Sequence, residues 1–202
     1  MNPCVAKPVL SVDLDEVLSD TYSFFTRTGA ERGLPLASTS LYHPRHWFTG
    51  APEEIASLTT YCDAMLHHAQ PVPSAMEAIR QLSEHFDLVV VTGRSEQRHQ
   101  SSTAAFLDRY FKDCFRAVRF CDHWGAATSK SEVLREMGAV AHVDDLPEFV
   151  LEAAGAGIPV LYLNRRLPWQ TEIEHPQVLT VRHWEDLTSA LLRAEFSPPI
   201  IG

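Results

Sequence analysis

The sequence predicts an α/β fold: a Rossmann-like, doubly wound and mostly parallel sheet flanked by helices. Short apolar runs rich in β-branched residues, such as Leu-Val-Val-Val at residues 88–91, are typical of buried parallel strands. From residue 73 onwards these runs alternate with segments of helical periodicity, and that alternation favours strand–helix–strand crossovers. A chain of 202 residues is long enough for one such domain with a small inserted one.

A small helical cap is expected between the first strand and the rest of the sheet. The first strand is predicted at residues 9–12, and a helix that follows it runs from about residue 17 to residue 32, where Gly33 ends it. A second helix begins at Pro52, after an irregular stretch. Its apolar stripe is Ile55, Leu58, Cys62 and Met65. The expected division is a cap at residues 18–72 and a core domain at residues 1–17 and 73–202.

The second part of the chain alternates between predicted strands and helices. Ser129 and Glu132 are spaced as a capping box at the start of one of the helices. Strands are predicted at residues 87–92, 116–121, 139–143, 158–163 and 178–181. Helices are predicted near residues 76–86, 95–111, 129–137, 145–156 and 184–191.

The composition argues against polyanionic and membrane partners. The formal net charge is -9 and no basic cluster is present, so we expect no nucleic-acid polymer as partner. A small phosphorylated substrate is still compatible, because local charge can oppose the net charge. No apolar stretch is long enough for a membrane span or a signal peptide, so we expect a cytoplasmic protein. The four cysteines form no C-x-x-C pair, which favours reduced thiols, and nothing indicates an oligomeric state.

Two carboxylates, Asp13 and Asp15, stand one residue apart where the first strand ends. In open α/β sheets ligands gather at the carboxyl ends of the strands. Two acids there can collect a divalent cation, and one can attack phosphorus; the alternative is that Asp15 caps a helix and Asp13 lies in a turn. The strand at residues 87–92 ends in Thr92 and is followed by Gly93. Their hydroxyl and N–H groups could hold a phosphate oxygen, or they could form an ordinary strand-to-helix turn.

Two further positions carry charge that needs a partner. Lys130 stands at a predicted helix start, where a cation opposes the helix dipole unless an anion is near; the alternative is an exposed surface lysine. Asp144 and Asp145 are adjacent at a predicted strand end, where they repel each other unless a cation or hydrogen-bond donors compensate. In the alternative, Asp145 is a helix N-cap with Glu148 as its partner, and Asp144 is exposed.

The joint order of these groups is more informative than each group alone. In this order the sequence resembles the haloacid dehalogenase-like (HAD) superfamily, over nearly the whole chain. The matching residues are Asp13, Asp15, Thr92, Lys130, Asp144 and Asp145. A narrower resemblance is to the 5'(3')-deoxyribonucleotidase-like branch of that superfamily. It is carried by residues 130–138 leading into 143–145, by Gly-Ile-Pro-Val-Leu-Tyr-Leu at 157–163 and by Leu-Pro-Trp at 167–169.

The resemblance implies a Mg²⁺-dependent phosphohydrolase that acts on a small phosphomonoester, such as a 5'-nucleotide or deoxynucleotide. It implies that Asp13 is the nucleophile, which forms an aspartyl-phosphate, and that Asp15 is the general acid and then the base. Mg²⁺ would be held by the Asp13 carboxylate, the Asp15 main-chain carbonyl and an acid from Asp144 or Asp145. The implied phosphate-binding residues are Thr92, Gly93 and Lys130.

One position departs from the family pattern. The residue after the second Asp is often small, and here it is Glu16, whose carboxylate could weaken phosphate binding if it pointed inward. We expect it instead to be the first residue of a helix and to face away, where its charge suits the dipole. Two alternatives to a hydrolase stay open: a weak or inactive binding or regulatory protein of the same fold, and a phosphotransferase that uses the same intermediate.

The cap is expected to select the substrate. A small cap that opens and closes can exclude water from the reaction. In the irregular stretch before the second helix, Tyr42 and Trp47 could stack on a nucleobase. The alternative is that these two rings pack the cap onto the core.

Overall fold

Six parallel strands form the sheet of the computed structural model, which describes residues 6–37, 40–60, 65–123 and 128–193. The strand order is β3-β2-β1-β4-β5-β6, and each neighbouring pair is parallel. The expected Rossmann-like sheet is therefore confirmed. The strands are β1 (Val9–Val12), β2 (Asp87–Thr92), β3 (Phe115–Phe120), β4 (Ala139–Asp144), β5 (Val160–Leu163) and β6 (Val178–Val181).

The strand order reverses in the middle of the sheet. β1, β2 and β3 lead to one edge, and the chain then returns to β4, beside β1, and continues to the other edge. Ligands of doubly wound sheets bind outside the carboxyl ends of the strands at such a reversal. The register pairs Val12 with Val143, so the residues that end β4 and those that follow β1 lie side by side.

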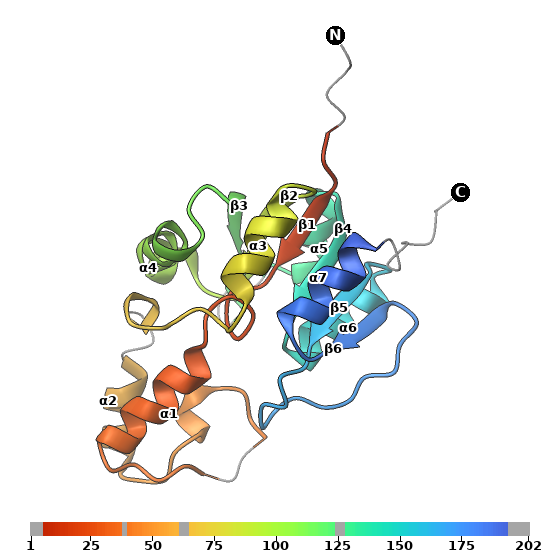
Figure 1. Cartoon of the computed structure of the whole chain (residues 1–202). Helices are drawn as coiled ribbons and strands as arrows, with labels where there is room; N and C mark the ends of the chain where they lie inside the picture. Colours follow the sequence, from red (N-terminus) through yellow and green to blue (C-terminus); the bar gives the residue numbers. More distant parts are fainter. Residues whose placement is uncertain (1–5, 38–39, 61–64, 124–127, 194–202) are drawn as a thin grey trace.

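Helices cover both faces of the sheet, as Figure 1 shows. Leu88 and Val90 of β2 face one core, and Val89 and Val91 face the other. Because side chains alternate along a strand, the continuous apolar run of β2 supplies both cores. The helices are α3 (Ala75–Ser83), α4 (Glu96–Tyr110) and α7 (Trp184–Leu192) on the first face, and α5 (Lys130–Glu136) and α6 (Pro147–Gly155) on the second.

Between β1 and α3 the chain forms a helical segment that lies beyond the carboxyl end of β1 (orange in Figure 1). Its apolar side chains pack with Leu146, Phe149 and Trp169 of the α/β part. Because this packing is continuous, the division into a cap at residues 18–72 and a core stays a prediction. The segment contains α1 (Thr21–Glu31), α2 (Pro52–Thr60) and the 3₁₀ turns η1 (Pro44–His46) and η3 (Met65–His67).

Two predicted boundaries in this segment are wrong. α1 begins at Thr21, later than predicted, because residues 14–19 form a hydrogen-bonded turn. α2 ends at Thr60, so Met65 belongs to η3 and not to the apolar stripe of α2. Cys62, from the same predicted stripe, lies outside the described residues.

The described residues carry two free thiols, Cys114 and Cys121. Cys4 lies outside the described residues. In the part of the chain that the structure describes, no helix has both the length and the apolar character needed to cross a bilayer.

Gly29 of α1 leaves room for the ring of Phe48, and this contact holds the irregular stretch against α1. A Cβ at position 29 would lie 2.1 Å from Phe48 Cε1. We expect Gly29→Ala to lower the free energy of unfolding by about 1–3 kcal/mol, the usual cost of overpacking. Urea denaturation measures this difference. Gly155→Ala is the control, because a Cβ there meets nothing within 4 Å. Equal losses in the two variants would contradict the close approach at Gly29.

Candidate active site

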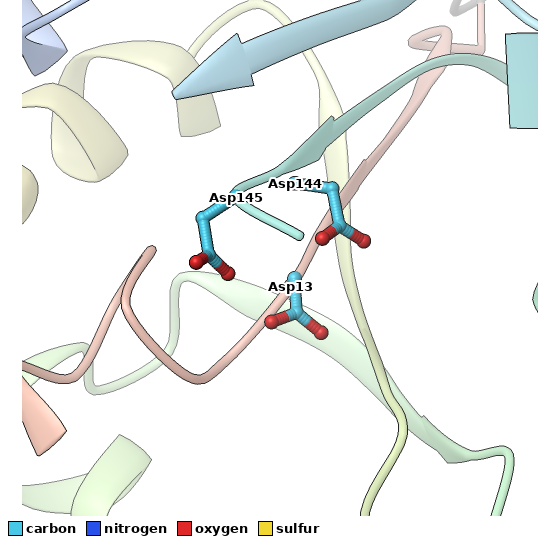
Figure 2. A group of neighbouring side chains, drawn as sticks. All are labelled: Asp13, Asp144 and Asp145. Atoms are coloured by element: carbon cyan, nitrogen blue, oxygen red, sulfur yellow. The ribbon is translucent and has the colours of Figure 1, made fainter. Parts of the chain in front are cut away.

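Three acidic side chains gather at the reversal of the strand order. Asp13 follows β1, Asp144 ends β4, and Asp145 comes next; the Asp13 N–H donates to Val143 O at 2.9 Å. One carboxylate oxygen from each acid lies within 4.8 Å of the others, and all three side chains are buried. Figure 2 shows them side by side at the ends of their strands. Buried carboxylates this close together repel each other unless a cation, hydrogen-bond donors or a bound proton compensates.

Lys130 supplies one positive charge to this cluster. Its Nζ donates to Asp13 Oδ1 at 2.8 Å and to Asp144 Oδ2 at 2.7 Å, and the side chain is 1% exposed. The same Nζ lies 4.2 Å from the centre of the Phe149 ring, a cation–π contact. Burial alone would lower the pKa of Lys130, but the two carboxylates outweigh burial and raise it. Lys130 is therefore a buried cation and not the exposed surface lysine of the alternative.

Glu152 of α6 places a negative charge at the start of α5, where Lys130 stands. Glu152 Oε1 accepts from Ser129 Oγ at 2.6 Å and from the Ser131 N–H at 2.9 Å. These hydrogen bonds outweigh burial and hold the pKa of Glu152 below its ordinary value. Its negative charge offsets the unfavourable position of Lys130 in the helix dipole. The predicted bond from the Glu132 N–H to Ser129 Oγ is present at 3.3 Å, but the sequence pattern missed Glu152.

Asp144 is held in one orientation by three donors. Its Oδ2 accepts from Lys130 and lies 2.8 Å from His142 Nε2, and its Oδ1 accepts from the Leu146 N–H at 3.0 Å. Lys130 and His142 outweigh burial and hold the pKa of Asp144 well below its ordinary value. His142 is itself buried, and its Nδ1 lies 3.0 Å from Ser11 Oγ. The alternative in which Asp144 is exposed is therefore wrong.

Asp145 has weaker partners than Asp144. Its Oδ2 accepts from Trp169 Nε1 at 3.4 Å and from Gln170 Nε2 at 3.3 Å. Burial and the neighbouring Asp144 raise its pKa well above the ordinary value. The predicted N-cap role of Asp145 is wrong, because α6 begins at Pro147 and its N-cap is Leu146.

The pKa of Asp13 reflects both its burial and the surplus negative charge around it. Burial raises the pKa of Asp13 to about 7, although Lys130 lowers it, and the carboxylates of Asp144 and Asp15 add to the rise. A second cation in the cluster would keep Asp13 ionised. The donors are hard carboxylate oxygens, and a cluster of such oxygens around surplus negative charge is the setting that Mg²⁺ prefers. The residues present therefore fit a divalent hard cation.

Asp15 is paired with a residue to which the sequence analysis gave no role. Arg94 Nε donates to Asp15 Oδ2 at 2.7 Å, and Arg94 NH2 donates to Asp15 Oδ1 at 2.8 Å. This is a bidentate pair between two buried side chains. Thr92, predicted to bind phosphate, is buried at the end of β2, and its Oγ1 accepts from the Arg94 N–H at 3.3 Å. The arginine directly after Thr92-Gly93 was the signal available in the sequence.

A cavity of about 550 Å³ opens above the acidic cluster. Asp13, Asp15 and Asp145 line it, and so does Gly93 from the predicted phosphate site. The wall on the α4 side includes Arg94, Ser95, Arg98 and His99, and the cap side contributes Phe25, Tyr42, Trp47 and Met65. One group of acids therefore faces a space large enough for a small ligand.

Trp47 packs the helical segment between β1 and α3 onto the α/β part. Its ring lies parallel to that of Trp169, with centroids 5.0 Å apart, and the side chain is 3% exposed. Tyr42 meets Trp169 edge to face at 5.3 Å. The packing alternative therefore describes Trp47, and the stacking of a nucleobase on either ring stays a prediction.

Glu16 is buried and does not begin a helix, so the expectation that it is the first residue of a helix is wrong. Its φ of 57° is left-handed, which is unfavourable for a residue with a Cβ. Glu16 Oε1 accepts from the Tyr22 N–H at 2.6 Å, at the start of α1, and Oε2 pairs with Arg165 at 3.0 Å. Burial raises the pKa of Glu16 to about 8. The carboxylate is therefore engaged by α1 and Arg165.

No family model matches the sequence, and no curated protein matches it either. The structure is similar to the haloacid dehalogenase-like family protein SP0104 of Streptococcus pneumoniae, with a TM-score of 0.62, 16% identity, and coverage of 92% of this chain and 98% of that one. It is also similar to YfnB of Bacillus subtilis, a candidate HAD hydrolase bound to magnesium (TM-score 0.64, 15% identity, 92% and 99% covered). A candidate β-phosphoglucomutase of Thermotoga maritima matches with a TM-score of 0.61 at 15% identity, with 92% and 99% covered.

This chain has the HAD-like fold. The likeness covers almost the whole chain and includes the parallel sheet on which the acids stand. Identities near 15% establish the fold and leave the chemistry to be argued from the site itself. The narrower resemblance to the deoxyribonucleotidase-like branch stays a prediction.

The charge on Lys130 should be essential to the folded state. In Lys130→Met the two carboxylates stay buried but lose their cation, so we expect the metal-free protein at neutral to basic pH to lose about 3–5 kcal/mol of unfolding free energy. Urea denaturation in the presence of a chelator measures this loss. Lys112→Met, at an exposed lysine, is the matched control and should change stability by less than about 0.5 kcal/mol.

The loss should shrink as the pH falls toward 5. Without Lys130 the buried carboxyls bind a proton more tightly in the folded state than in the unfolded one, where their pKa is about 4. The folded variant therefore loses stability as the pH rises from about 4 to its raised folded pKa. A loss below about 1 kcal/mol, or one that does not depend on pH, would contradict this account of the cluster.

Proposed function

We propose that this chain is a Mg²⁺-dependent phosphohydrolase that acts on a small phosphomonoester through an aspartyl-phosphate on Asp13. A 5'-nucleotide or deoxynucleotide is the first substrate class to test. One observation carries the proposal: Asp13 lines a cavity, is held by Lys130 and stands within a cluster of acids that fits a hard cation.

Asp13 and one or both of Asp144 and Asp145 would hold the metal. Asp145 is the more available of the two as a metal ligand, because its hydrogen bonds from Trp169 and Gln170 are long and its pKa is raised. Asp144 is already engaged by three donors, so it fixes the positions of Lys130 and β4. When bound, Mg²⁺ supplies positive charge that offsets the repulsion between a carboxylate and a phosphate dianion.

The chain's own residues would carry the two chemical steps. Asp13 attacks phosphorus, and the bond to the leaving oxygen breaks while Asp15 gives that oxygen a proton. Water then attacks phosphorus, Asp15 takes the proton of the water, and Asp13 is released as a carboxylate together with inorganic phosphate. Lys130 contacts the attacking carboxylate directly, at 2.8 Å, so its charge would offset the repulsion between that carboxylate and the phosphate dianion. Thr92 and the Gly93 N–H would orient the phosphate.

One observation favours the alternative of a catalytically weak binding protein. Both oxygens of Asp15 accept hydrogen bonds from Arg94, so the group assigned to proton transfer is engaged in this state. Phosphate release from a panel of phosphomonoesters, with and without Mg²⁺, separates the two functions. Added glycerol as an alcohol acceptor separates hydrolysis from phosphotransfer, because a phosphotransferase would form glycerol phosphate in place of inorganic phosphate.

We expect Asp13→Asn to lower phosphate release by about 10³-fold or more, because an amide is not a nucleophile toward phosphorus. The fold should stay intact, because the Asn oxygen can still accept from Lys130. Asp108→Asn, at an exposed position on α4, is the control and should keep the wild-type rate. Wild-type turnover in Asp13→Asn would remove Asp13 as the nucleophile, and no release from wild type with any substrate would favour the binding protein.

A further inference from the structure

Arg94 is one of two buried cations among the Lys and Arg side chains of the described residues; the other is Lys130. Lys130 is committed to Asp13 and Asp144 beneath the site. Arg94 lines the cavity through which a ligand must enter. An anion that enters the cavity therefore meets the Arg94 guanidinium at its wall.

One partner of the Arg94 side chain in this structure is Asp15, and the pair is bidentate, with bonds of 2.7 and 2.8 Å. A guanidinium fork matches a phosphate as well as it matches a carboxylate, because both offer two oxygens in one plane at a similar spacing. A phosphate dianion carries more negative charge than Asp15. It can therefore compete for the fork without any loss in the number of charge-assisted bonds.

We propose that Arg94 exchanges partners: its guanidinium holds Asp15 in the free protein and transfers to the phosphate of the incoming ligand, which releases Asp15 toward the leaving oxygen. The release of Asp15 for chemistry rests on the proposed function, whereas the exchange itself requires phosphate binding alone. Arg94 thereby becomes a phosphate-binding residue in addition to those implied by the resemblance. Asp15 becomes available only when a phosphate has arrived.

Hydrogen bonds hold the backbone around Arg94, so the exchange would take place by rotation of the side chain. The Arg94 N–H donates to Thr92 Oγ1 at 3.3 Å, and Arg94 O accepts from the Asp122 N–H at 3.1 Å. Gly93 O accepts from the His123 N–H at 2.9 Å. The pair with Asp15 also keeps the guanidinium dehydrated before binding. The free energy needed to bury the guanidinium charge therefore does not reduce the affinity for phosphate.

The competing explanation is that Arg94 is a structural clamp between β1 and the turn after β2. A clamp would contribute to stability but would not bind phosphate. The two explanations differ in how Asp15 and Arg94 are coupled. If the partners exchange, Asp15 and the phosphate compete for the Arg94 guanidinium. If Arg94 is a clamp, Asp15 affects phosphate binding only as a nearby negative charge.

Isothermal titration of inorganic phosphate in the presence of magnesium chloride tests this coupling with four proteins: wild type, Asp15→Asn, Arg94→Ala and the double variant. We expect Arg94→Ala to weaken phosphate binding by about tenfold or more. We expect Asp15→Asn to tighten it by about threefold or more, because the fork is no longer occupied. In the Arg94→Ala background that gain should disappear.

An equal gain from Asp15→Asn in both backgrounds would overturn the exchange, since simple removal of a negative charge predicts it. Unchanged phosphate affinity in Arg94→Ala, or no phosphate binding by wild type, would overturn it as well. Arg80→Ala, at an exposed arginine on α3, is the control for loss of one positive charge. Thermal unfolding followed by circular dichroism checks that each variant is folded.

If Arg94→Ala does not fold, Arg94→Lys takes its place in the titration. Lysine keeps the buried charge beside Asp15 but offers a point charge in place of the fork, so phosphate affinity should fall by about fivefold; wild-type affinity would overturn the exchange. Turnover separates this inference from the proposed function. If the predicted coupling is found in a protein that releases no phosphate, the phosphatase is refuted and the exchange stands. If the protein turns over substrate but shows no coupling, the exchange is refuted and the phosphatase stands.

Discussion

The contact of Lys130 with Asp13 and Asp144 is the interaction on which the site depends. It joins the end of β1 to the start of α5, 117 positions away in the sequence, and to the end of β4, 14 positions further on. Each of these charges would be costly to bury alone, and one cation between two carboxylates still leaves surplus negative charge. Burial, together with that surplus, raises the pKa values of Asp13 and Asp145. The fold thus buries more acids than it neutralises, and the three acids could hold a metal ion.

Trp169 connects the acidic cluster to the helical segment between β1 and α3. Asp145 accepts a hydrogen bond from Trp169, whose ring stacks on Trp47 of the cap. Both acids and aromatic side chains line the cavity. A ligand with a phosphate and an apolar or aromatic body would suit such a lining. Arg94 and Asp15 also line this cavity, so their pair is accessible to the phosphate of such a ligand.

Local patterns predicted the strands and the order of the charged groups, because each depends on a few neighbouring residues. The bounds of β2 and β6 agree with the prediction, and the joint order of acids, threonine and lysine indicated the HAD-like fold. Side-chain partners were not predictable in this way: Arg94 and Asp15 are 79 positions apart, and only the packed sheet brings them together. The N-cap assigned to Asp145 and the helix start assigned to Glu16 failed for the same reason. Tertiary partners occupy groups that local propensity would place in caps.

The central claim is that Asp13 forms a covalent bond to phosphorus. The most direct test is acid quenching of the protein during turnover of a phosphomonoester, followed by mass spectrometry of its peptides. The account predicts the mass of one phosphoryl group on the peptide that contains Asp13, with none on the same peptide of Asp13→Asn. Turnover without a modified peptide, or a phosphoryl group on another residue, would contradict the account.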